Sequence, residues 1–241
     1  MDITILGDGA LGRVVADSAR AAGHDARLIG RPADGRHDPA TLRGDVVVEC
    51  SRPEAVATNL AAALDGGARR FVIATTAWSD DRDLVEGLLL GRDAAAVASS
   101  NFSLGVALFG RLVDAAVDLF GHVDGFDPYL VEWHRRAKAD RPSGTARDLA
   151  DRIAARHPDL TTAADLEVVS VRAGASPGMH LVGFDAAGET LEIRLTARDR
   201  TAYAAGILAA AEWLVRVPRP AGLHPFAPIV DELLARRPIA A

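Results

Sequence analysis

A histidine, several cations and the start of a helix lie close together in the middle of the chain. Residues 131–146 contain His134, Arg135 and Lys138, followed by Pro142 and a Ser-Gly-Thr sequence. Histidine exchanges a proton near neutral pH, and Lys138 adds a mobile positive charge. This combination is typical of a site that binds and protonates a small anion. The alternative is a solvated basic loop in front of an ordinary capped helix, with His134 as a structural histidine.

The helix that follows Pro142 predicts an anion clamp. Ser143, Gly144 and Thr145 open a segment that we expect to be helical to about Arg156. The first N–H groups of a helix have no intrahelical partner and carry the positive end of its dipole, so they bind carboxylates and phosphates. We therefore expect Ser143, Gly144 and Thr145 to bind an anionic substrate, and His134 and Lys138 to act in catalysis.

The chain opens with the elements of a nucleotide-binding turn. An apolar strand, Asp2–Leu6, leads into a glycine-rich turn and then an alanine-rich helix to about Ala22. The turn consists of Gly7, Asp8, Gly9, Ala10, Leu11 and Gly12. This order of strand, G-x-G-x-x-G and helix predicts a dinucleotide site in which the pyrophosphate rests on the helix N-terminus. A purely structural turn is the alternative.

The end of the second strand bears on the choice of cofactor. An NAD site usually has an acidic residue here, about twenty residues past the glycines, to bind the ribose hydroxyls. This chain has Gly30 followed by Arg31. A guanidinium that is able to hold a 2′-phosphate favours NADPH, with NADH possible. Arg31 as an ordinary solvated loop residue is the alternative.

Strands and helices alternate over the first hundred residues. The expected strands are Asp2–Leu6, Asp25–Ile29, Asp45–Glu49, Arg70–Ile73 and Ala94–Ala98, with helices ending near Leu64 and Leu90 among those between them. This alternation predicts a Rossmann-type, doubly wound parallel sheet of the α/β class, which binds ligands at the carboxyl ends of its strands.

Small polar residues follow several of these strands. We expect two groups to contact the cofactor: Ala74, Thr75 and Thr76 after the fourth strand, and Ser99, Ser100, Asn101 and Phe102 after the fifth. Ordinary turn chemistry is the alternative, because serine, threonine and asparagine are common in turns.

After Asn101 the pattern changes to that of an α+β domain. A helix from about Leu104 to Leu119 precedes an extended run, Phe126–His134, and three β-like runs follow the Ser143–Arg156 helix. These runs are Leu166–Arg172, Met179–Phe184 and Thr190–Thr196; final helices are expected at Arg200–Val215 and Pro225–Ala235. We predict a dinucleotide-binding domain of residues 1–103 plus 200–241, and a substrate-binding and oligomerisation domain of residues 104–199 with a mixed or antiparallel sheet.

Composition narrows the class of protein. The 241 residues carry a net charge of -6, which argues against nucleic-acid binding, and they contain no apolar run that is long enough to span a membrane. The start, Met1-Asp2-Ile3, has no basic segment or cleavage site, so we expect no secretory signal. A single cysteine, Cys50, fits the reducing cytoplasm and rules out a metal site built from cysteines; no metal is expected.

Many of these residues also match one enzyme family. The matching positions are Ser51-Arg52-Pro53-Glu54, Thr75-Thr76, Asn101-Phe102-Ser103, Gly105-Val106, Glu132, His134, Lys138, Asp140, Pro142-Ser143-Gly144-Thr145-Ala146, Arg172, Gly174, Gly178, His180, Leu191-Glu192-Ile193, Arg200, Gly206, Trp213 and Leu214. On these residues the chain resembles, nearly end to end, the dihydrodipicolinate reductase (4-hydroxy-tetrahydrodipicolinate reductase) family of lysine and diaminopimelate biosynthesis.

The resemblance implies a mechanism and an assembly. In the family, NAD(P)H passes a hydride to C4 of a cyclic unsaturated imine dicarboxylate, and a proton is added at C3. His134 matches the general acid, Lys138 its cationic partner, and Gly144 and Thr145 the carboxylate clamp. A bound dianion is expected to raise the pKa of His134 toward the working range. The family's second domain builds a homotetramer, so a homotetramer is expected here.

Several positions depart from the family pattern. The glycine-rich turn is one residue shorter and lacks an internal basic residue, and alanines at 74 and 77 replace the glycines of a G-T-T-G motif. Arg135 and Leu195 stand where the family has histidines. Three interpretations stay open: a divergent orthologue in which Arg135 binds a carboxylate, a paralogous reductase of another cyclic imine carboxylate, and a non-catalytic NADP(H) sensor.

Overall fold

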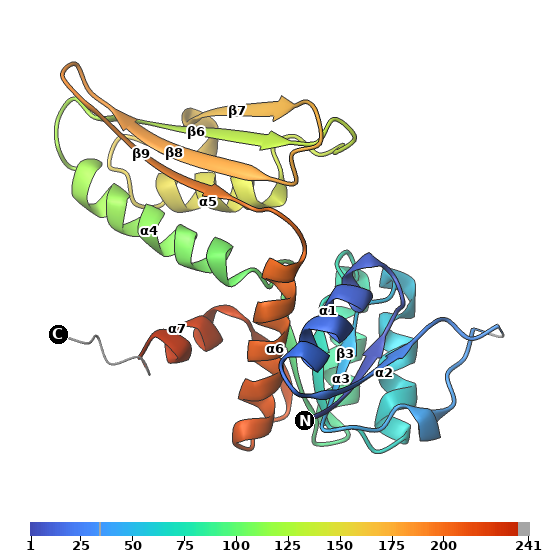
Figure 1. Cartoon of the computed structure of the whole chain (residues 1–241). Helices are drawn as coiled ribbons and strands as arrows, with labels where there is room; N and C mark the ends of the chain where they lie inside the picture. Colours follow the sequence, from blue (N-terminus) through green and yellow to red (C-terminus); the bar gives the residue numbers. More distant parts are fainter. Residues whose placement is uncertain (34, 236–241) are drawn as a thin grey trace. The chain divides into compact units, whose positions relative to one another are not determined.

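The chain folds into two compact units, each built around its own β-sheet (Figure 1). The computed structural model describes residues 1–33 and 35–235. The first unit combines Met1–Leu104 with the described residues from Arg200 onward, and the second is Gly105–Asp199.

The first unit is a three-layer α/β fold. Its elements are β1 (Asp2–Leu6), α1 (Ala10–Ala21), β2 (Asp25–Ile29), β3 (Val46–Glu49), α2 (Val56–Asp65), β4 (Arg70–Ile73), α3 (Arg82–Leu90), β5 (Ala95–Ala98), α6 (Thr201–Arg216), β10 (Gly222–Pro225) and α7 (Ala227–Ala235). All neighbouring strands pair in parallel, in the order β10-β5-β4-β3-β1-β2. Helices α1 and α6 pack together against the sheet, as do α2 and α3. The predicted doubly wound parallel sheet is confirmed.

The strands of this sheet are apolar because both of their faces are buried. In β1, Ile3 and Ile5 are fully buried, and Leu6 packs into the cluster formed with α2 and α3. Burial on both faces removes the polar alternation of a half-exposed strand. Since β1 lies between β2 and β3, the strand order reverses at β1, and such a reversal opens a crevice at the carboxyl ends of the strands.

One prediction near the end of the chain is wrong. Pro225, expected to open the final helix, is the last residue of β10, and the helix begins at Ala227. Residues Gly222–Pro225 pair with β5 at the edge of the sheet. An edge position tolerates a proline because no further strand needs its missing N–H. A four-residue strand whose partner lies far away in the sequence has no periodicity of its own to reveal it.

The second unit is a two-layer α+β fold. Its elements are α4 (Leu104–Phe120), β6 (Asp127–His134), α5 (Gly144–Ala154), β7 (Glu167–Arg172), β8 (Met179–Asp185) and β9 (Thr190–Thr196). The strand order is β7-β6-β8-β9, with β6 and β7 parallel and the other pairs antiparallel, so the sheet is mixed. Figure 1 shows α4 and α5 against one face of this sheet. Leu130, Val182 and Phe184 of the sheet form part of the buried core between the sheet and these two helices.

The opposite face of this sheet is open and apolar. Trp133, Val169 and Val171 have exposed fractions of 39%, 44% and 37%. In β6 they alternate with buried residues, and in β7 with less exposed ones, on the face toward the helices. In β9 the apolar residues Leu191, Ile193 and Leu195 alternate with polar ones, and they lie on the covered face, since they pack against the core formed with α4 and α5. Among the described residues, no helix is both long and apolar enough to cross a membrane.

Candidate active site

The register of the second sheet brings five polar side chains together. Along β6, Glu132 and His134 lie two residues apart and therefore share the face toward the helices. Glu132 pairs with Ser170 of β7 on one side and with His180 of β8 on the other, and His134 pairs with Arg172. Residues from three strands thus meet at one end of the sheet.

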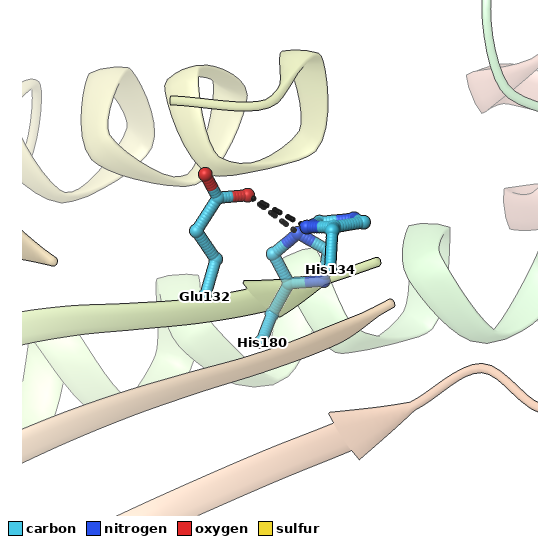
Figure 2. Close-up of side chains that lie close together, drawn as sticks. All are labelled: Glu132, His134 and His180. Carbon is cyan, nitrogen blue, oxygen red and sulfur yellow. Dashed lines mark ion pairs between the residues drawn. The ribbon is translucent and has the colours of Figure 1, made fainter. Parts of the chain in front are cut away.

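Glu132 is the centre of this cluster. Its Oε1 accepts hydrogen bonds from Arg172 Nη2 at 2.7 Å, Ser170 Oγ at 2.5 Å and the backbone N–H of Ser143 at 2.9 Å. Its Oε2 lies 3.1 Å from His134 Nδ1 and 3.8 Å from His180 Nε2 (Figure 2). The side chains of Glu132 and Arg172 are both fully buried.

The cluster strongly perturbs its ionisable groups. Burial raises the pKa of the Glu132 carboxyl, but the hydrogen bonds from Ser143, Ser170 and Arg172 outweigh burial and bring this pKa to about 2. Burial lowers the pKa of His134; the Glu132 carboxylate opposes that effect, and the nearby cations add to it. Burial and the neighbouring His134 lower the pKa of His180 to about 4. Glu132 is thus an anion and His180 a neutral ring at physiological pH.

The geometry also permits a different interpretation of these three residues. The ligand atoms of Glu132, His134 and His180 lie within 4.8 Å of one another, close enough for a metal ion to bridge. However, the Arg172 guanidinium already forms an ion pair with the same carboxylate, and its positive charge would repel a metal ion. We therefore interpret the cluster as a hydrogen-bonded network.

Ser143 joins this network to the predicted anion clamp. Ser143 is the N-cap of α5, and its Oγ accepts a hydrogen bond from the N–H of Ala146. The same Oγ lies 3.2 Å from His180 Nε2, while the Ser143 N–H donates to Glu132. Gly144 and Thr145 are the first residues of α5. The cap is therefore tied to the strand that carries His134.

The two predicted cations lie in the loop between β6 and α5. Lys138 Nζ pairs with Asp140 Oδ1 at 2.7 Å and keeps about a quarter of its side chain exposed. Arg135 is exposed. Lys138 is also the only lysine in the chain, since the other cationic side chains are arginines. A charge alone is equally well supplied by arginine, so this exception points to a need for the smaller ammonium group.

A pocket lies in the first unit, at the carboxyl ends of β1, β2 and β3. Its volume is about 410 Å³, and it brings together four of the predicted cofactor residues, Gly7, Asp8, Gly9 and Arg31. Its other lining residues are Pro32, Gly35, His37, Cys50, Ser51, Arg52, Glu54, Ala55, Thr58 and Asn59. The pocket lies at the reversal of strand order, where such sheets bind nucleotides.

The glycines of the turn have different roles. A Cβ at Gly7 would lie 2.6 Å from the carbonyl oxygen of Cys50, and one at Gly12 would lie 1.9 Å from that of Gly7, so both allow the turn to close. A Cβ at Gly9 would meet nothing within 4 Å. The open space beside Gly9 lies at the N-terminus of α1, which Ala10 begins and Leu11 continues, as a bound pyrophosphate requires.

An acidic side chain does approach the end of β2. A Cβ at Gly30 would lie 3.1 Å from Asp8 Oδ2, so the carboxylate that the second strand lacks is supplied by the turn. Asp8 and Arg31 line the same pocket. In nucleotide sites generally, a carboxylate favours ribose hydroxyls and a guanidinium favours a 2′-phosphate, and this pocket contains one side chain of each kind.

Hydrogen bonds to the neighbouring strand β3 hold the segment that follows β4. The N–H groups of Ala74 and Thr75 both donate to the carbonyl of Glu49, and Thr75 is buried while Thr76 is exposed. Ala77 has a φ of 61°, in the left-handed region that favours the glycine of the family motif.

The segment after β5 is ordered by its own side chains. Ser99 Oγ accepts from the N–H of Asn101, and Asn101 Oδ1 accepts from the N–H of Ser103. Phe102 is buried against Phe226, with ring centroids 4.9 Å apart, and Ser100 is exposed. That Ala74, Thr75, Thr76, Ser99, Ser100, Asn101 and Phe102 contact a cofactor stays a prediction.

Sequence reasoning assigned no role to the residues around His134. Glu132, Arg172 and His180 entered only as positions that match the family, and Ser170 did not enter at all. The available signal was the two-residue spacing of Glu132 and His134, which places both on one face of a strand. In the first unit, Ser51 and Arg52 line the nucleotide pocket, and the available signal was their place two and three residues after the end of β3.

The two units together define a class of protein. A parallel sheet with a nucleotide pocket at its strand reversal accompanies a second unit that carries a histidine, a lysine and a capped helix start. These are the features of an oxidoreductase that uses a nicotinamide dinucleotide.

Comparisons with known proteins define the family. The family model described as "Dihydrodipicolinate reductase, C-terminus" matches residues 105–225. A 4-hydroxy-tetrahydrodipicolinate reductase of Exiguobacterium sp. is 34% identical over 249 residues, covering 96% of each chain. The enzyme of that name from Archaeoglobus fulgidus is 32% identical over 208 residues, covering 80% of this chain and 77% of its own. The chain therefore belongs to the dihydrodipicolinate reductase family.

Solved structures agree on the fold. A dipicolinate-bound dihydrodipicolinate reductase from Paenisporosarcina sp. TG-14 superposes with a TM-score of 0.71 at 17% identity, covering 93% of this chain and 97% of its own. An engineered D-amino acid dehydrogenase bound to NADP+ gives a TM-score of 0.52 at 17% identity, covering 98% of this chain and 99% of its own.

Proposed function

We propose that this chain uses NAD(P)H to reduce 4-hydroxy-tetrahydrodipicolinate to tetrahydrodipicolinate in lysine and diaminopimelate biosynthesis. The observation that carries the proposal is the link between His134 and the start of α5, through Glu132 and Ser143, in a chain of this family. A proton donor and an anion clamp on one framework suit a dicarboxylate that must be protonated as it is reduced.

His134 supplies the proton in this proposal. A reduced nicotinamide dinucleotide, when bound, supplies a hydride to C4 of the substrate. The electron pair displaced toward C3 then takes the proton of the His134 imidazolium. Burial lowers the pKa of His134 in the free protein, and the two negative charges of a bound substrate reverse this by favouring the charged ring.

Lys138, Gly144 and Thr145 hold the substrate in this proposal. The N–H groups at the start of α5 bind one carboxylate with directed hydrogen bonds, and Ser143 fixes their position as the N-cap. The Lys138 ammonium, which is paired with Asp140 at 2.7 Å, provides the mobile charge for the anion. Arg135, exposed beside His134, is placed to bind a carboxylate through its planar fork.

Two features of the nucleotide pocket support the binding of a dinucleotide. The space beside Gly9 admits a pyrophosphate at the start of α1, and Arg31 lines the same pocket. We infer a preference for NADPH, because the Arg31 guanidinium is able to form charge-assisted hydrogen bonds to a 2′-phosphate. The carboxylate of Asp8 weakens this preference and leaves NADH usable.

A homotetramer is part of the proposal. Trp133, Val169 and Val171 leave an apolar sheet face open. An exposed apolar face of this kind is usually covered by a partner. Since the face lies opposite α4 and α5, pairing of copies through it leaves their packing intact.

The experiment that tests the function is an NADPH oxidation assay with purified protein. Freshly generated hydroxytetrahydrodipicolinate is the substrate, and other cyclic imines run in parallel. His134→Gln is expected to lower kcat by about 10²–10⁴-fold and to leave NADPH affinity unchanged, because a positioned general acid contributes about that much. Lys138→Met is expected to raise KM as well. Lys138→Arg keeps the positive charge, so comparing the two variants separates the effect of the charge from that of the smaller ammonium group.

Three outcomes count against the proposal. Full activity of His134→Gln means that the acid is wrongly assigned. A much better rate with another cyclic imine carboxylate favours a paralogue, an alternative that rests on Arg135 and on Leu195, which pairs with His180 across β8 and β9. NADPH binding with no turnover of any imine favours a sensor.

A further inference from the structure

The two atoms that join Glu132 to His134 are both buried. Oε2 of Glu132 and Nδ1 of His134 lie 3.1 Å apart, but their alignment is not that of a good hydrogen bond, and among the described residues neither atom has any other hydrogen-bond partner. Catalytic hydrogen bonds are often imperfectly aligned before substrate binds and tighten afterwards. Each of these atoms therefore has the other as its available partner.

We propose that Glu132 is the positioning residue of His134: it holds a proton on Nδ1 and so directs Nε2 to deliver the catalytic proton. The proposal rests on the role of His134 as the general acid. As a charged acid, His134 carries protons on both nitrogens. After Nε2 has given up its proton, the neutral ring keeps the Nδ1 proton facing the carboxylate.

The surroundings of Glu132 fix its orientation. Oε1 is already occupied by Arg172, Ser170 and the backbone N–H of Ser143. Three donors on one oxygen prevent the carboxylate from rotating freely. The other oxygen is therefore left for His134, and its charge favours the protonated imidazole.

His180 does not compete for that oxygen. Ser143 Oγ accepts from the Ala146 N–H, so its own proton is free to be donated to His180 Nε2, 3.2 Å away. A nitrogen that accepts this hydrogen bond has no proton to offer Glu132 Oε2, which lies 3.8 Å away. The position of Ser143 thus reserves Oε2 for His134.

The other ring nitrogen of His134 borders a glycine. A Cβ at Gly178 would lie 3.1 Å from His134 Nε2 and 3.4 Å from its Cδ2. The absence of a side chain at Gly178 leaves room beside the nitrogen that we assign as the donor. Nδ1 is buried and turned toward Glu132, so the two nitrogens differ in their surroundings.

The negative charge of Glu132 gives the proposal a measurable consequence. The groups facing His134 are Glu132 on its own strand, His180 on β8, Arg172 on β7, and Lys138 and Asp140 in the following loop. Lys138 and Arg172 disfavour the imidazolium, whereas Glu132 and Asp140 favour it. Removing the charge of Glu132, the nearest anion, must therefore lower the pH at which the His134 imidazolium loses its proton.

The first experiment is the pH profile of kcat for Glu132→Gln. Loss of a charge at this distance is expected to move the basic limb down by about one to two pH units. At pH 8 this lowers kcat by about 10–100-fold, with recovery as the pH falls. Glu132→Asp, which keeps the charge, is expected to leave the basic limb closer to its position in the parent than Glu132→Gln does. Ser170→Ala is the matched control: it removes a hydrogen bond to Oε1 but no charge, so the limb should stay in place.

The outcomes separate this proposal from the proposed function. A uniform loss of kcat in Glu132→Gln with the limb unmoved overturns the positioning role, as does an equal shift in Ser170→Ala. Full activity of His134→Gln overturns the assignment of the acid instead.

A second measurement does not depend on the folding of any variant at position 132. The ¹⁵N NMR spectrum of histidine-labelled parent protein reports the tautomer of each ring, and His134→Gln identifies the resonance of His134. We expect the neutral ring of His134 to carry its proton on Nδ1. A proton on Nε2 instead refutes the positioning role.

Discussion

Arg172→Met is expected to destabilise the second unit strongly. Arg172 and Glu132 form an ion pair at 2.7 Å with both side chains fully buried. The Arg172 guanidinium also donates to the carbonyl of Asp140 at 2.6 Å. Methionine fills much of the same volume but leaves the Glu132 charge buried without its cation.

The magnitude follows from the structure in two ways. Removing one partner of a buried ion pair costs about 3–5 kcal/mol. Independently, the pKa of Glu132 is about 2, against an ordinary value of 4.5. That difference corresponds to about 3 kcal/mol of stability at neutral pH. The two figures agree, and part of the second comes from Ser143 and Ser170, which the variant retains.

The loss of stability in Arg172→Met is expected to depend on pH. In the parent, the pKa of Glu132 is lower in the folded state, so its contribution is complete above about pH 4.5 and is lost as the pH falls toward 2. In Arg172→Met, burial is left with less opposition and raises the pKa of Glu132. Protonation then relieves the penalty as the pH falls. The difference in stability is therefore largest at neutral pH and shrinks in acid.

Urea unfolding followed by circular dichroism, at one protein concentration and several pH values from 7 to 4, measures this difference. The control is Arg152→Met, because Arg152 pairs with Asp114 and Asp148 near the surface and 38% of its side chain is exposed. Its loss should cost less than about 1 kcal/mol. A cost for Arg172→Met that is equally small, or that does not change with pH, refutes the reasoning.

Three further predictions concern cofactor, substrate and assembly. Arg31→Ala should weaken NADPH about tenfold or more and leave NADH nearly unchanged in calorimetric titrations, since a charge-assisted phosphate contact is worth about 1.5–3 kcal/mol. Asp8→Asn should strengthen NADPH binding, and equal affinities for both cofactors in the parent contradict this scheme. Arg135→His should keep activity on hydroxytetrahydrodipicolinate in steady-state assays if the chain is a divergent orthologue; loss of that activity, with a better rate on another imine, favours a paralogue. Val171→Lys should break the assembly by placing like charges on the open sheet face, and a monomeric parent in light scattering at micromolar concentration contradicts the tetramer.

The parts of the fold that could be predicted from the sequence are those determined by local patterns. The strand, glycine turn and helix of residues 2–21 gave the correct order because each element has its own periodicity or turn chemistry. Strand β10 was missed because its four residues become a strand only beside β5. The open apolar face of the second sheet was also missed, since β9 shows its alternation clearly but not which face the helices cover.

The sequence by itself determined which groups are available for chemistry: an imidazole at His134, an ammonium at Lys138 and a helix cap at Ser143. These groups belong to residue types and short spacings, and both can be read along the chain. The tertiary structure decided what surrounds them.

Glu132 meets Ser170 and His180 because β6 pairs with β7 and β8 in one particular register, and a shift of one residue would turn each side chain to the opposite face. Asp8 similarly reaches the space beside Gly30 because β1 and β2 are neighbours in the sheet. Such contacts join residues that are distant along the chain, so no local pattern encodes them, and only the folded sheets bring them together.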